Sequence, residues 1–195
     1  MRKMMLILTI ATIYSALLGC TAAVIPTTSY VPQNVVRYEH KNSVDMGAFT
    51  YEPELRKEVE ANQIQFNSLG GSLYINTSVS EMVKRATGLE LEKTGVLISE
   101  LSDVTIGGDV VELKVNPLGG FNTMTWDYTI RYKIFQKKDQ KLLFSKEYRI
   151  PTIRTGEQNQ PRDYAPLVHE MVLSGYDMFI RDREVRALLD VPPLH

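Results

Sequence analysis

An unbroken alternation of apolar and polar residues at positions 126–134 places the strongest constraint on how this chain can fold. Apolar or aromatic side chains take every second position: Trp126, Tyr128, Ile130, Tyr132 and Ile134. Successive side chains of a strand point to opposite faces, so the stretch predicts a strand with one buried and one wet face. A turn is predicted at residues 137–140 and a partner strand at residues 142–150, so we expect an antiparallel hairpin.

The first predicted helix begins at Ser78, which with Glu81 forms a capping box. Apolar residues recur at helical spacing up to Leu89, and Gly95 is expected to end the helix. A second helix is expected after Asp163, with Pro166 in its first turn, where proline is tolerated.

The remaining strands are expected at residues 44–51, 63–66, 72–75, 96–106 and 109–115. Gly107 and Gly108 are interpreted as a turn between the last two, and the polar residues 151–162 as a mobile loop. This order of elements predicts an α+β fold with a mostly antiparallel twisted sheet and two helices packed on one face.

The N-terminus has the layout of a secretory signal peptide. Arg2 and Lys3 precede an apolar run that ends in small residues, and the run is shorter than the roughly 20 residues that cross a bilayer. Residues 17–20 (LLGC) resemble the bacterial lipobox and contain Cys20, the only cysteine of the chain. A disulfide within one chain is therefore excluded.

The lipobox resemblance implies cleavage before Cys20 and lipidation of its sulfur, because only a thiol offers this chemistry at the membrane. Two acyl chains already anchor a protein stably. Thr21 resembles the exported class of such proteins, which favours the periplasmic face of the outer membrane over the inner membrane. We therefore divide the chain into a signal peptide (1–19), a flexible tether (20–42) and a single periplasmic α+β domain (43–195).

The layout as a whole resembles the YajG-like bacterial envelope lipoproteins. The resemblance rests on Cys20, the strand at 44–49, the stretch SVSEMVKRA (78–86) leading to Gly95, the hairpin, and a C-terminal helix near REVRALL (183–189). More distantly, the chain is similar to the auxiliary lipoproteins PqiC and LptE. The resemblance implies a non-enzymatic domain at the outer membrane and carries over no catalytic or binding residue.

The sequence indicates no enzyme, cofactor or metal site. His40, His169 and His195 show no metal-ligand spacing, and no nucleophile elbow or phosphate loop is present. The formal net charge of −1 gives no support for nucleic-acid binding. We interpret Trp126, Tyr128 and Tyr132 as core rather than as a ligand-gripping stripe.

The leading hypothesis is a lipid-anchored envelope protein with a binding, structural or auxiliary role toward an envelope protein of unknown identity. Its candidate partner surfaces are the wet face of the long strand (Asp127, Thr129, Arg131 and Lys133) and the loop 151–162. The alternative is a carrier of a lipid or small apolar ligand, with a cavity lined by Met82, Trp126, Met171 and Phe179. An enzyme acting on peptidoglycan would need a pocket joining His169 to two or more carboxylates.

Overall fold

The computed structural model describes residues 22–27, 30–33, 43–66, 72–118, 123–156 and 160–189. Cys20 and the leader lie outside these ranges. The strands are β1 (Ala23–Ile25), β2 (Ser43–Tyr51), β3 (Gln63–Phe66), β4 (Leu73–Ile75), β5 (Leu97–Ile98), β6 (Val104–Leu118), β7 (Thr123–Gln136) and β8 (Lys141–Gly156). The helices are α2 (Glu52–Leu55), α3 (Val79–Thr94), the 3-10 helix η1 (Pro161–Tyr164), α4 (Ala165–Ile180) and α5 (Arg183–Leu189).

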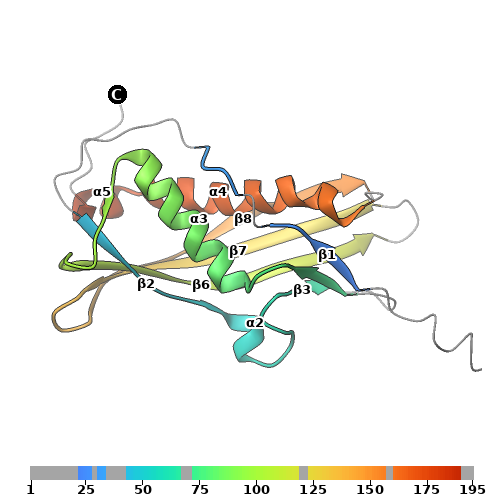
Figure 1. The fold of residues 1–195 in the computed structure, drawn as a ribbon, viewed down its shortest axis with the longest axis horizontal. Coiled ribbons are helices and arrows are strands. Elements are labelled where there is room, and N and C mark those ends of the chain that lie inside the picture. The colour runs from blue at the N-terminus through green and yellow to red at the C-terminus, as the bar shows by residue number, and fades with distance from the viewer. Residues whose placement is uncertain are drawn as a thin grey trace, which may run out of the picture.

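Three long antiparallel strands, β6, β7 and β8, form the body of the sheet (Figure 1). The predicted hairpin is confirmed, with Ile134 opposite Phe144 and Tyr128 opposite Ile150. On the far side of β6, β2 pairs with its first part and β3 with its last part, both parallel to it. β5 runs parallel to β2, and β1 runs parallel to β4. The sheet is thus mixed: its long strands are antiparallel, as expected, but β1, β2, β3 and β5 also form parallel pairs that the sequence did not predict.

The predicted turn at Gly107 and Gly108 is wrong, because both residues lie inside β6. β2 approaches β6 so closely here that a Cβ on Gly107 would lie 2.7 Å from the Ala48 carbonyl oxygen. A Cβ on Gly108 would lie 2.9 Å from the Phe49 ring. The β2–β6 register also shifts between Met46 and Phe49. The two glycines therefore allow β2 and β6 to approach closely, and they do not form a turn.

Two further segments are more ordered than their composition predicts. Residues 151–156 of the expected mobile loop continue β8, and Thr123 of β7 pairs with Gly156. Pro151 is tolerated because β8 has a neighbour on one side only among the described strands, and the β7–β8 register shifts beside it. Likewise, part of the expected flexible tether forms β1, which pairs with β4. Both corrections come from backbone pairing with strands distant in sequence.

The predicted ends of the first helix are confirmed. The Ser78 hydroxyl accepts a hydrogen bond from the Glu81 backbone N–H at 3.2 Å, and Gly95 stops α3 in the left-handed conformation, with φ of 97°. In the second helix, Pro166 lies in the first turn of α4, as predicted.

Both long helices cover the same face of the sheet (Figure 1). Tyr132 of β7 contacts each of them: its hydroxyl lies 3.1 Å from the Thr87 hydroxyl of α3, and its ring stacks on Phe179 of α4 with centroids 4.3 Å apart. The helices are also joined by a 2.9 Å hydrogen bond between the Thr94 and Tyr176 hydroxyls. The core therefore lies between β7 and the pair α3 and α4, as the alternation predicts.

The two helix glycines should respond in opposite ways to substitution. A Cβ on Gly175 would lie 3.0 Å from Ile130, so Gly175→Val should lower the free energy of unfolding by about 1–3 kcal/mol through overpacking. A Cβ on Gly88 would lie 3.5 Å from Ile98, which is ordinary contact, so Gly88→Ala should raise the free energy of unfolding by about 0.5–1 kcal/mol through helix propensity. Urea unfolding of both variants measures the difference. Equal effects would contradict the tight packing of α4 on β7.

Candidate binding surfaces

Exposed leucines gather at one end of the sheet. We define the leucine end as Leu97, Leu101, Leu142 and Leu143, whose exposed fractions are 67%, 95%, 50% and 37%. Strand pairing places them at the same end of the sheet, spread from β5 to β8, because Ser43 pairs with Leu97, while Val104 pairs with Gln136 and Gln136 with Lys141. Single exposed leucines are ordinary on protein surfaces, but several at one end mark a candidate contact surface.

The turn that carries Leu101 is held firmly in place. The Ser102 hydroxyl donates to the Ser43 carbonyl oxygen at 2.5 Å, and the Ser99 backbone N–H donates to the Val44 carbonyl oxygen at 2.8 Å. On the other side, the Lys137 ammonium contacts both the Glu100 carbonyl oxygen and the Asp45 carboxylate. Leu101 is thus presented almost fully to solvent from a fixed backbone, so a partner would bind it without first ordering the turn.

The predicted wet face of β7 is not a free polar surface. Thr129 is buried, and Arg131 pairs with Glu52 of α2 at 2.7 Å, Asp109 of β6 at 3.2 Å and Glu147 of β8 at 3.0 Å. Lys133 pairs with Asp109 at 2.5 Å. Alternation predicted the direction of these side chains correctly, but not the carboxylates that neighbouring elements bring to meet them.

The charges in this cluster stabilise one another. Burial raises the pKa of Asp109, but the hydrogen bonds from Lys133 and Thr50 outweigh it, and the net pKa lies below the usual value. The hydrogen bond to Glu52 raises the pKa of Arg131. A hollow of about 260 Å³ lies beside the Asp109–Lys133 pair, lined also by Gly47 and Gly107. The pairing leaves neither charge uncompensated, so the hollow has no evident preference for an ionic ligand.

A segment near the N-terminus crosses the helices. We call residues 22–27 and 30–33 the N-terminal strap. The Thr27 backbone N–H and hydroxyl both donate to the Asn76 amide oxygen, at 2.9 and 3.0 Å. Tyr30 reaches both helices, because its hydroxyl donates to the Glu90 carboxylate of α3 at 2.5 Å and its ring lies 5.1 Å from His169 of α4. The amino-acid composition of this segment did not predict that it packs against the helices.

Glu90 is the buried carboxyl group that fixes the strap. Its side chain is 0% exposed, and it also accepts a 2.9 Å hydrogen bond from the Gln33 backbone N–H. Burial, together with the hydrogen bond to Glu90, raises the pKa of Tyr30. Burial lowers the pKa of His169, opposed by a hydrogen bond to the Thr27 backbone. His169 thus supports the strap.

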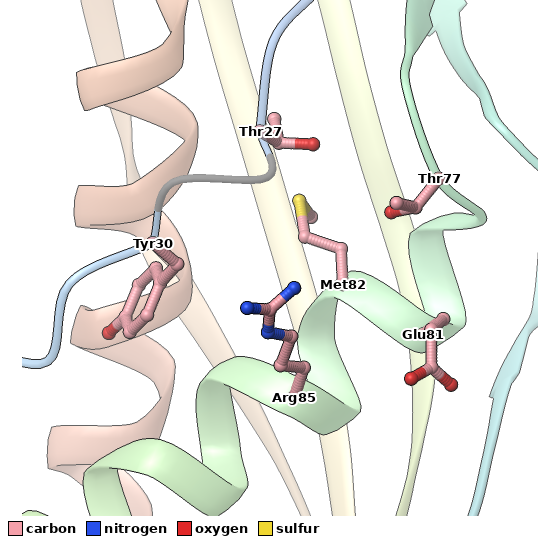
Figure 2. Close-up of a pocket in the computed structure, with 6 residues that line it drawn as sticks. All are labelled: Thr27, Tyr30, Thr77, Glu81, Met82 and Arg85. Carbon is pink, nitrogen blue, oxygen red and sulfur yellow. The ribbon is translucent and has the colours of Figure 1, made fainter.

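A small cavity lies beneath the strap (Figure 2). It measures about 60 Å³ and is lined by Thr27, Tyr30, Thr77, Glu81, Met82 and Arg85. Figure 2 shows the side chain of Arg85, on α3, between those of Tyr30 and Met82. Ligand pockets usually measure about 300–1,000 Å³, so this space suits a few waters rather than a metabolite.

Of the residues expected to line a carrier cavity, Met82 lines the cavity of about 60 Å³ beneath the strap, while Trp126 and Phe179 pack against neighbouring rings. All four are buried, and the Trp126 ring lies 5.2 Å from that of Tyr164 while its N–H donates to the Thr155 hydroxyl at 3.2 Å. Phe179 stacks on Tyr132. These contacts confirm the interpretation of Trp126 and Tyr132 as core and disfavour the carrier hypothesis at this place.

Within the described ranges, no three His, Cys, Asp or Glu side chains cluster so as to hold a metal ion. The same residues include no helix with the length and apolar character that spanning a bilayer requires.

Comparison with known proteins identifies the fold. No family model and no curated protein matches the sequence. Among solved structures, the chain is similar to XCC0632 from Xanthomonas campestris, described as a DUF330 protein, with 12% identity and a TM-score of 0.60, covering 81% of this chain and 92% of that one. At this identity, the likeness shows a shared fold alone.

Two other solved structures match less closely, and no argument rests on them. CT253 from Chlamydia trachomatis has 11% identity and a TM-score of 0.46, covering 77% of this chain and 96% of that one. Lipoprotein GNA1162 from Neisseria meningitidis has 9% identity and a TM-score of 0.38, covering 68% and 96%. The YajG-like resemblance stays a hypothesis drawn from the sequence.

Two Tyr→Phe substitutions test the strap. Tyr30→Phe removes a donor from buried Glu90 and should lower the free energy of unfolding by about 1–3 kcal/mol, with faster amide exchange in residues 30–33. Tyr128→Phe is the control, because its buried hydroxyl has no hydrogen-bond partner among the described residues, and it should be neutral or stabilising. Hydrogen exchange and urea unfolding report both. A neutral Tyr30→Phe would contradict the role assigned to Glu90.

Proposed function

We propose that this chain is a bacterial lipoprotein anchored through Cys20 at the periplasmic face of the outer membrane, where it binds another envelope protein without catalysing a reaction. The leader and the lipobox-like LLGC stretch support the anchor, and Thr21 supports the choice of membrane. The observation that carries the binding role is Leu101, which is 95% exposed on a turn held by Ser102 and Lys137.

The anchor is tested by blocking signal peptidase II with globomycin and by substituting Cys20. Globomycin should cause a precursor to accumulate, and the wild-type chain should incorporate labelled palmitate and fractionate with membranes. Cys20→Ser should lose the palmitate label. A Cys20→Ser chain that is processed identically and still fractionates with membranes would overturn the anchor.

The partner surface is tested by photocrosslinking in intact cells. A photoreactive amino acid at position 101 should crosslink to a discrete envelope protein. The matched control is Leu55, another exposed leucine (65%), which lies on α2. Introducing Leu97→Asp into the chain with the probe at 101 should remove the crosslink, because it charges the same surface. Equal crosslinking from positions 55 and 101 would refute the leucine end as the binding surface.

A further inference from the structure

The described fold begins only a few residues after the proposed lipid attachment. Ala23, the first residue of β1, is tied to the sheet by a 3.1 Å hydrogen bond from its backbone N–H to the Ser72 carbonyl oxygen. The chain is held again at Thr27 and Tyr30. The described residues 22–27 and 30–33 therefore belong to the folded domain and not to a long spacer.

Covalent geometry then limits how far the domain can stand from the membrane. Ala23 follows Cys20 by three positions, and an extended chain spans at most about 3.3–3.6 Å per residue. A lipid on the Cys20 sulfur would thus keep the start of β1 close to the membrane, because the backbone of Ala23 can lie at most about 11 Å from that of Cys20.

Strand pairing identifies what else lies at this end. β1 pairs with β4 from Ala23, and the last residues of β3 and β6 lie beside the first residues of β4 and β7. We define the basal end as the ends of the strands at Ala23, Leu118, Thr123 and Gly156. Figure 1 shows it opposite the leucine end along the longest axis of the molecule.

The basal end carries side chains suited to a phospholipid surface. Val24 and Leu118 are 51% and 42% exposed. Arg154, two residues before the end of β8, is exposed. Arg162 is exposed too; its guanidinium lies 3.9 Å from the Asp163 carboxylate, and its helix, η1, contacts β1. Apolar side chains can enter the headgroup region, and cations are attracted to anionic lipids.

We propose that the basal end rests on the phospholipid bilayer and that the leucine end projects away from it. This inference rests on the proposed anchoring through Cys20. β7 has 14 residues, which at about 3.3 Å each span roughly 45 Å. The leucine end is thereby held well clear of the membrane, where a partner can reach Leu101.

The chain's use of a single cysteine makes the test direct, because lipidation consumes that thiol and leaves an introduced one unique. Leu118→Cys and Leu101→Cys, each in the full lipidated chain, are labelled with a fluorophore. Each is reconstituted in phosphatidylethanolamine–phosphatidylglycerol vesicles that contain lipid with a nitroxide at the headgroup. Leu55→Cys serves as a further exposed-leucine control.

Quenching should be several-fold stronger at position 118 than at positions 101 and 55. Equal quenching at 118 and 101 would show a sheet lying flat on the bilayer and would overturn the proposal, as would stronger quenching at 101. Flotation and palmitate labelling of the same samples separate the two proposals. A chain that is not lipidated refutes the anchor and this inference together, whereas a floating chain without quenching at 118 refutes this inference alone.

Discussion

The aromatic face of β7 is the contact on which the rest of the structure depends. Tyr132 meets α3 through Thr87 and α4 through Phe179, so one side chain joins the sheet to both long helices. Burying a large apolar side chain contributes about 1.5–3 kcal/mol, and this face supplies several. Because neighbouring residues of a strand point to opposite sides, the same strand necessarily presents Arg131 on the other face. There Glu52, Asp109 and Glu147 compensate its charge.

The mixed topology follows from what lies between the paired strands in sequence. Parallel neighbours such as β2 and β6 need a long crossover, and here it comprises α2, β3, β4, α3 and β5. The crossover places α3 on the sheet face that α4 also covers. The close approach of β2 to Gly107 and Gly108 lets the two strands pair despite the register shift between Met46 and Phe49.

The N-terminal strap relates the fold to the proposed anchor. Glu90 is fully buried, and a buried polar group is tolerated only where hydrogen bonds compensate its lost hydration. The strap supplies two of these bonds, from Tyr30 and Gln33. A chain segment that satisfies a buried carboxylate cannot also act as a loose spacer. An anchor at Cys20 would therefore act on the position of the whole domain and not on a free tail.

The sequence by itself determined the elements whose signals are local. The alternation at 126–134 defined β7 and its buried face, and Ser78 with Gly95 defined the ends of α3. Tertiary structure decided the rest, because the deciding contacts join residues distant in sequence. From sequence alone Gly107 resembles a turn residue, but Ala48 packs against it inside the sheet. Residues 151–156 resemble a loop, but they pair with β7. The strap takes its conformation from contacts with Asn76, Glu90 and His169. A local sequence pattern shows the periodicity of its own segment. Which other segment pairs with it is decided by the packing of the whole chain.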